Sequence, residues 1–153
     1  MQRQDRIPRM RGFDYSQART YFVTLCVQNR KRIFSDRKIA ALAQGELKSF
    51  RDRGWYWLYA FVVMPDHIHI LVRLRDDLKT LGRIVATIKS AIQFRSRRAG
   101  VDLQWQYNFY DHVVRLDEPV DEIVGYILRN PERAGLVRQG EDYPFAGMVD
   151  PYR

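Results

Sequence analysis

The 153-residue chain has the length of one domain, and its 46% of hydrophobic and 13% of aromatic residues exclude an intrinsically disordered protein. Its lone cysteine, Cys26, excludes an internal disulfide and predicts a reducing compartment. The longest apolar run, residues 58–64, is too short to span a bilayer, and the first residues lack the apolar core of a signal peptide. We therefore expect a cytoplasmic protein without a membrane partner. A formal charge of +8 and a pI near 9.9 favour a polyanionic partner.

Two groups of arginines are candidates for contacts with that partner. Residues 1–18 are predicted to form a basic, irregular arm, which is typical both of a solvated tail and of a segment that contacts phosphates. Its arginines are Arg3, Arg6, Arg9 and Arg11. The second group, Arg95, Arg97 and Arg98, lies at the end of a predicted helix, where it either complements the helix dipole or contacts a DNA backbone.

Strands and helices follow one another in a simple order along the rest of the chain. Runs rich in aromatic and β-branched residues, or with alternating apolar residues, predict strands at 21–27, 55–64, 67–74 and 107–116. Apolar residues at helical spacing predict a helix between Ser35-Asp36 and Gly54, a second from Leu81 to about Gly100, and a third that begins at Glu118-Pro119. In the third helix we expect proline at the first helical position.

The order of these elements predicts the fold. Strand, helix, strand, strand, helix and strand is the ferredoxin-like split βαβ pattern, an α+β sandwich with an antiparallel central sheet. The strand at 55–64 is apolar almost throughout, so we expect it to be covered on both faces. The last helix is an addition to this pattern.

The third predicted strand contains two histidines. Its apolar residues alternate from position 68 to 74, so His67 and His69 point to the same face with Cα atoms roughly 6.6 Å apart. One such histidine alone is typical of a hydrogen-bonded structural residue, and we interpret the third histidine, His112, in that way. Two neighbouring buried imidazoles cost free energy unless both find partners, and one metal ion, bound at about 2.1 Å, satisfies both. The pair therefore favours a metal site.

The last helix is the element that can cover this histidine face. If the first two helices pack on the apolar side of the strand, the other side stays open until a further layer covers it. Tyr126 and Asn130 lie one turn apart on one flank of the last helix, so we expect a phenol and an amide at the rim of the histidine face. Pro131 predicts that Asn130 lies in the last, distorted turn. Tyr126 by itself also fits an amphipathic tyrosine at the edge of a core.

Two motifs carry a resemblance to a known family. Residues 64–69, Met-Pro-Asp-His-Ile-His, resemble the His-hydrophobic-His motif of HUH endonucleases, and residues 126–137 resemble the tyrosine motif of the REP-associated tyrosine transposases. Further matches lie at residues 14–17, 21–24, 109–112 and 142–145. The resemblance thus spans nearly the whole chain. Asp66 departs from the family pattern, which usually has asparagine there, and it either tunes metal affinity or serves the turn.

The resemblance implies one HUH tyrosine transposase domain over residues 1–153. It implies that Tyr126 attacks a phosphodiester of single-stranded, hairpin-forming DNA and leaves a 5′-phosphotyrosine link and a free 3′-hydroxyl. It also implies that His67, His69 and Asn130 hold a divalent metal ion, Mg²⁺ or Mn²⁺, and that the protein works as a monomer or a homodimer. The arginines that we expect to contact DNA are Arg9, Arg11, Arg95, Arg97, Arg98 and Arg133.

Three other functions fit part of the pattern. A non-catalytic ferredoxin-like nucleic-acid-binding module predicts that Tyr126→Phe leaves all activity unchanged, and the signatures of RRM-type RNA-binding modules are not evident in this sequence. A zinc hydrolase with an activated water predicts cleavage without a protein–DNA adduct. A rolling-circle initiator or relaxase is the nearest enzyme alternative, but such proteins usually carry additional domains that 153 residues cannot hold.

Overall fold

The computed structural model describes residues 19–152. Its elements are β1 (Thr20–Cys26), η1 (Gln28–Arg30), η2 (Ile33–Ser35), α1 (Arg37–Asp52), β2 (Tyr56–Met64), β3 (His67–Leu74), α2 (Leu81–Arg98), β4 (Tyr110–Val113), α3 (Val120–Arg133) and β5 (Ala146–Gly147). The predicted basic arm at residues 1–18, with Arg9 and Arg11, lies outside the described residues. Within residues 19–152, none of the helices combines the length and the hydropathy that a membrane span needs.

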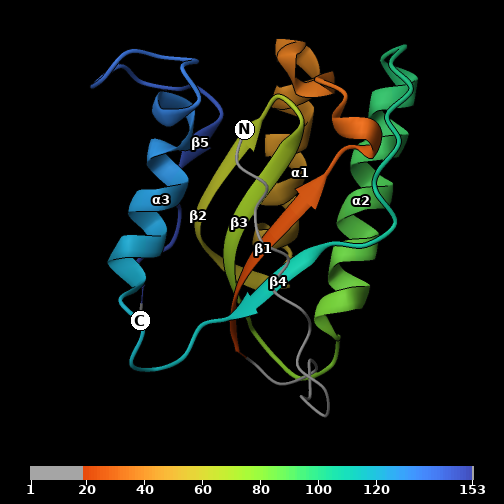
Figure 1. Ribbon diagram of the computed structural model, residues 1–153. Helices are drawn as coiled ribbons and strands as arrows, with labels where there is room; N and C mark the ends of the chain where they lie inside the picture. The colour runs from red at the N-terminus through yellow and green to blue at the C-terminus, as the bar shows by residue number, and fades with distance from the viewer. Residues whose placement is uncertain (1–18, 153) are drawn as a thin grey trace.

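The strands form one antiparallel sheet in the order β4-β1-β3-β2-β5 (Figure 1). The order of the first four strands is that of a ferredoxin-like sandwich, so the predicted α+β fold is confirmed. Helices α1 and α2 cover one face of the sheet, and α3 lies on the opposite face (Figure 1). The sheet is therefore the middle of three layers.

Capping residues set the boundaries of α1 and α2, and of these residues Asp36, Gly54 and Gly100 were predicted and Thr80 was not. Asp36 accepts a backbone hydrogen bond at the start of α1, and Thr80 does the same for α2. Gly54 and Gly100, which follow these two helices, have φ values of 86° and 87°, where a side chain would be strained. The predicted position of Pro119 is wrong by one residue: it is the N-cap of α3, because its ψ of 95° is extended and not helical.

Strand β3 sends different side chains to the two faces of the sheet. Ile68 and Ile70 belong to the apolar core beneath α1 and α2, whereas Leu71 belongs to a second apolar cluster that includes Ile127 of α3. The ring of His69 also lies on the α3 side. The predicted separation of apolar residues and histidines by period-two alternation is therefore confirmed.

Strand β2 is covered on both faces, as predicted, but it contains a bulge that the sequence pattern did not indicate. Leu58 pairs with Val72 and Ala60 pairs with Leu71, so Tyr59 is an extra residue in the ladder. Because a bulge shifts the alternation by one, Tyr59 and Ala60 both belong to the α3-side cluster.

The chain after α3 returns to the free edge of β2. Strand β5 pairs with Phe61 and Val62, and the Tyr143 hydroxyl donates to the Val63 carbonyl at 2.6 Å. Asp150 accepts a hydrogen bond from the Leu58 backbone N–H at 2.8 Å, beside the bulge. Neither β5 nor these attachments was predicted, because a two-residue strand has no periodicity of its own.

Strand β4 is shorter than the predicted 107–116. The chain before it makes one isolated bridge, between Trp105 and Val27, and then leaves the sheet. The Lys89 ammonium donates hydrogen bonds to the carbonyls of Gln106 and Asn108 at 2.8 and 3.3 Å. These side-chain hydrogen bonds replace the ladder at the start of the predicted strand.

Candidate active site

His67 and His69 lie side by side on the α3 face of β3. Their rings are 4.7 Å apart between centroids at an interplanar angle of 75°, and the residues are 6% and 0% exposed. Two imidazoles at this distance converge on a common volume, which is the arrangement that the strand pattern predicted. Their other neighbours determine which ring nitrogens face that volume.

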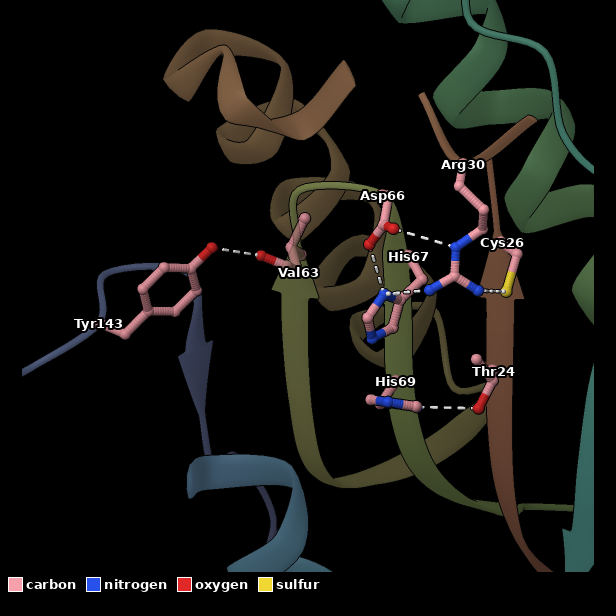
Figure 2. A network of polar contacts seen from close by, with 8 residues as sticks. All are labelled: Thr24, Cys26, Arg30, Val63, Asp66, His67, His69 and Tyr143. Atoms are coloured by element: carbon pink, nitrogen blue, oxygen red, sulfur yellow. Dashed lines mark hydrogen bonds and ion pairs between the residues drawn. The ribbon is translucent and has the colours of Figure 1, made fainter. Parts of the chain in front are cut away.

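The orientation of His67 is fixed by a carboxylate (Figure 2). Nδ1 of His67 lies 2.7 Å from Oδ1 of Asp66, and Arg30 donates through Nε to the other oxygen of Asp66 at 3.0 Å. Burial acts to raise the pKa of Asp66, but the hydrogen bonds from His67 and Arg30 outweigh it and lower that pKa to about 2. An ionised carboxylate only accepts, so Nδ1 of His67 carries a hydrogen, and Nε2 is the ring nitrogen left to bind an ion.

The orientation of His69 is fixed from the neighbouring strand. Thr24 of β1 is its cross-strand partner, and the Thr24 hydroxyl lies 2.8 Å from Nδ1 of His69 (Figure 2). Burial holds the pKa of His69 well below its ordinary value, and the nearby positive charge of Arg30 acts in the same direction. His69 is therefore a neutral imidazole, the form that binds metal ions.

Tyr126 reaches this pair from the opposite layer. Its ring centroid is 5.8 Å from that of His69 and 6.0 Å from that of Phe22 of β1, with both contacts close to edge-to-face. The Arg133 guanidinium covers the Tyr126 ring at 4.1 Å from its centroid and donates to the Tyr126 carbonyl. The phenol that the sequence placed at the rim of the histidine face thus lies against one of the two histidines, with a cation beside it.

Asn130 lies one turn after Tyr126, in the last turn of α3, and is half-buried. The helix continues through Pro131, whose ring is buried, and ends at Arg133. Among residues 19–152, no group of three or more histidine, cysteine, aspartate or glutamate side chains could hold a metal ion. A site on His67 and His69 therefore needs a ligand of another type, and the amide oxygen of Asn130 is chemically suited to that place.

The arginines that we expected to contact DNA lie in two different places. Arg133 adjoins Tyr126, as described above. The α2 arginines lie on the other side of the sheet: Arg95 pairs with Glu46 of α1, Arg97 lies 3.5 Å from Asp102, and Arg98 lies over the ring of Phe94. Of these arginines, the structure thus brings Arg133 to the histidines and Tyr126 and does not bring the α2 cluster there.

Sequence reasoning missed several residues of the site. Thr24 and Phe22 had a usable signal, because both alternate with the core residues of β1 and so must share the histidine face. Arg30 had none: it follows a turn in which Asn29 has a φ of 58°, and Arg30 itself has a φ of 53°. That left-handed backbone directs the chain back toward Asp66, which a local pattern does not reveal.

Comparison with known proteins agrees with this geometry. The family model described as Transposase IS200 like matches residues 16–130, a span that contains both histidines and Tyr126 and ends at Asn130. The chain belongs to this family of transposases. A REP-associated tyrosine transposase of Escherichia coli strain K12 is 30% identical over 132 residues, which are 86% of this chain and 78% of that protein. The predicted membership of the REP-associated group is confirmed.

Solved structures show the same relationship. The structure of a REP-associated tyrosine transposase bound to a REP hairpin matches with a TM-score of 0.71 and 26% identity, over 92% of this chain and 82% of that one. A protein from Deinococcus radiodurans matches with a TM-score of 0.54 and 19% identity, over 79% of this chain and 95% of that one, and shows the shared fold alone. As a family member, the chain is an enzyme of DNA cleavage and strand transfer.

Proposed function

We propose that the chain is a metal-dependent, single-stranded DNA endonuclease and strand transferase that acts on hairpin-forming DNA through a 5′-phosphotyrosine intermediate. The observation that carries this proposal is the contact between Tyr126 of α3 and His69 of β3, with ring centroids 5.8 Å apart. A nucleophile and a pair of metal-binding side chains come from different layers of the fold and meet at one place. The REP hairpin bound by the solved relative supports a hairpin as the substrate.

The residues at the site fit a divalent ion. Asp66 and Thr24 bind the Nδ1 atoms of the two histidines, and hydrogen bonds of this kind fix the tautomer and orientation of metal-ligating imidazoles. His67 and His69 would ligate through Nε2, and Asn130 through its amide oxygen, a mixed set that suits Mn²⁺ and tolerates Mg²⁺. When bound, the ion supplies Lewis-acid polarisation of the scissile phosphate.

The chain's own residues account for the covalent step. The Tyr126 oxygen forms a bond to phosphorus as the bond between phosphorus and the 3′ oxygen breaks. The phenol loses its proton and the leaving 3′ oxygen gains one, so the strand ends in a 3′-hydroxyl and the 5′-phosphate stays on the protein. Because the phosphotyrosine retains the energy of the cut bond, attack by a 3′-hydroxyl reverses the step without ATP.

Arg133 supplies positive charge at the same place. Its guanidinium lies over the Tyr126 ring, 4.1 Å from the centroid, and its residue is exposed to solvent. A phosphate that approaches Tyr126 therefore meets an arginine that is already oriented, and arginine is well suited to bind phosphate oxygens. Its hydrogen bond to the Tyr126 carbonyl also holds the guanidinium beside the nucleophile.

The direct test is capture of the covalent intermediate. The full chain is incubated with Mn²⁺ and an end-labelled single strand that folds into a REP-type hairpin, and the products are separated on a denaturing gel. We expect a labelled band retarded by the mass of the protein, and its loss in Tyr126→Phe. Tyr152→Phe is the matched control, because Tyr152 is a half-exposed tyrosine that contacts Tyr59 and not the histidines. Cleavage without an adduct would favour hydrolysis by water instead.

Metal binding is tested separately from cleavage. Titration calorimetry with Mn²⁺ in the absence of DNA should show one site per chain, weakened in His67→Ala and in Asn130→Ala. His112→Gln is the control, because His112 bonds to Glu118 at 2.7 Å and lies outside the proposed ligand set. Equal Mn²⁺ affinity in wild type and His67→Ala would contradict the assigned ligands.

A further inference from the structure

A pocket opens beside Tyr126, between α3 and the edge of the sheet formed by β1 and β4. Its volume is about 290 Å³, close to the lower end of small-ligand sites, which measure about 300 to 1,000 Å³. The residues that line it are Phe22, His112, Glu118, Glu122, Ile123 and Tyr126. Neither the metal site nor the covalent step described above uses this space.

The walls of the pocket are apolar and partly aromatic. Phe22 comes from β1 and Ile123 from α3, and the Phe22 and Tyr126 rings meet at an interplanar angle of 78°. Aromatic side chains of this kind are stacking platforms for the flat faces of nucleobases, whatever their sequence. These apolar and aromatic walls therefore suit a flat, uncharged group.

Two carboxylates stand beside these apolar walls, in a protein whose formal charge is +8. Glu118 is held by His112 at 2.7 Å and by the Arg115 backbone N–H at 3.0 Å. Burial acts to raise the pKa of Glu118, but these hydrogen bonds lower it, so the carboxylate is ionised at neutral pH. Glu122 is exposed and lies one helical turn before Tyr126. Two negative charges repel a phosphate, so the DNA backbone must pass outside the pocket.

The position of the pocket determines which part of the DNA it can receive. Tyr126 is at once the proposed nucleophile and a wall of the pocket. A phosphate that reaches the Tyr126 oxygen therefore brings its neighbouring nucleotide to the pocket mouth. In a single strand that nucleotide is unpaired, so its base can turn out of the stack at small cost.

We propose that this pocket binds the base of the nucleotide next to the scissile phosphate, and that Glu122 accepts a hydrogen bond from the exocyclic amino group of that base. Carboxylates pair with the amino group of cytosine in this way, and thymine has no amino group to offer. The pocket thus prefers cytosine over thymine. This inference rests on the proposed function, because it takes single-stranded DNA as the ligand.

The first test needs no cleavage. Fluorescence anisotropy measures the affinity of the full chain for the unstructured, labelled octamers dC8 and dT8 at one fixed salt concentration. We expect dC8 to bind about tenfold more tightly, within the range of discrimination by a well-placed side-chain contact to a base. Glu122→Ala should reduce this ratio to about one, and Glu122→Gln should raise the affinity for dT8, because an amide N–H can donate to a thymine carbonyl.

The matched control is Asp121→Asn. Asp121 and Glu122 are consecutive, exposed acidic residues in the first turn of α3. Neutralising either residue therefore removes one negative charge at the same end of the helix dipole. Asp121 does not line the pocket. Asp121→Asn should keep the preference for dC8. Equal binding of the two octamers by wild type, or a preference that survives in Glu122→Ala, would overturn the proposal.

The second test locates the base relative to the cut. Hairpin strands that form the covalent adduct are prepared with cytosine or thymine at each nucleotide flanking the mapped cleavage position, and adduct formation is compared. We expect adduct formation to favour cytosine over thymine at one of the two flanking nucleotides, and we expect Glu122→Ala to abolish this preference. No preference at either flanking nucleotide would overturn the placement of the base beside Tyr126. If no adduct forms at all, the proposed function fails. The affinities of Tyr126→Phe for dC8 and dT8, which need no cleavage, still decide whether the pocket prefers cytosine.

Discussion

The two faces of β3 carry different kinds of side chain. On one face, Ile68 and Ile70, whose side chains have no polar atoms, belong to the apolar core beneath α1 and α2. On the other, His67 and His69 are held by hydrogen bonds to Asp66 and to a threonine of the next strand. One strand thus contributes stability through one face and candidate chemistry through the other, and alternation keeps the two functions one residue apart.

The largest expected effect comes from substituting two consecutive residues of β3 in separate variants, one residue on each face of the sheet. His69→Ala should reduce adduct formation by at least about 100-fold, because it removes a proposed metal ligand. Ile70→Ala should lower the free energy of unfolding by about 2–5 kcal/mol, because it leaves a cavity in the core, while the folded fraction still forms adduct. Urea unfolding and the gel assay measure the two effects. Loss of adduct in the folded Ile70→Ala protein would show that the two faces of β3 do not separate stability from catalysis.

Asp66 sharpens the comparison on the histidine face. Asp66→Ala should weaken Mn²⁺ binding by about 10 to 100-fold, the usual effect of removing the hydrogen-bond partner of a ligating histidine. Asp66→Asn should weaken it less, because the amide oxygen still accepts from Nδ1 of His67. Calorimetric titration with Mn²⁺ gives both affinities. Equal affinity of wild type and Asp66→Ala would show that Asp66 serves the turn alone.

Ionised groups also attach the C-terminal segment, so acid should first loosen the edge of the sheet formed by β2 and β5. The hydrogen bonds from Arg51 lower the pKa of Asp150 below its ordinary value. A lowered pKa contributes stability that is present above the unfolded-state value of about 3.9 and is lost as the pH falls through the lower, folded-state value. Protection of the β5 amides from hydrogen exchange, followed from pH 5 downward, should therefore fall before protection of the Ile70 amide.

The variant Asp150→Ala tests the same attachment at neutral pH. It leaves the buried Leu58 backbone N–H without its acceptor, so the free energy of unfolding should fall by about 1–3 kcal/mol. The difference from wild type should shrink as the pH falls, since protonation of Asp150 weakens the same hydrogen bonds. Urea unfolding at pH 7 and pH 3 measures both values, and a difference independent of pH would contradict the assignment.

The smallest expected effect concerns the arginines. Arg133→Gln should lower the slope of log affinity for single-stranded DNA against log salt by about 0.7, because it removes one phosphate contact. Arg98→Gln, on the far side of the sheet, is the comparison. We expect the larger change for Arg133, because that residue adjoins Tyr126. An equal change in slope for Arg98→Gln would indicate that DNA also contacts the arginine cluster on α2.

Much of the fold could be predicted because it follows from the local periodicity of apolar residues. The strand and helix bounds follow from alternation, from helical spacing and from caps such as Asp36 and Gly54, and each of these signals lies within a few residues of chain. The bulge at Tyr59 and the short β4 could not be predicted in this way. They depend on partners distant in the sequence, Asp150 near the bulge and Lys89 before β4.

The sequence by itself determined that His67 and His69 share a face and that Tyr126 and Asn130 share a helix flank, because both relations follow from the geometry of a single element. Only the tertiary structure decided that Arg30 reaches Asp66, that Arg133 and not the α2 cluster adjoins Tyr126, and that a pocket opens between α3 and β4. The physical reason is that those contacts join elements far apart in the chain, and their existence depends on strand register and on the packing of α3 against the sheet.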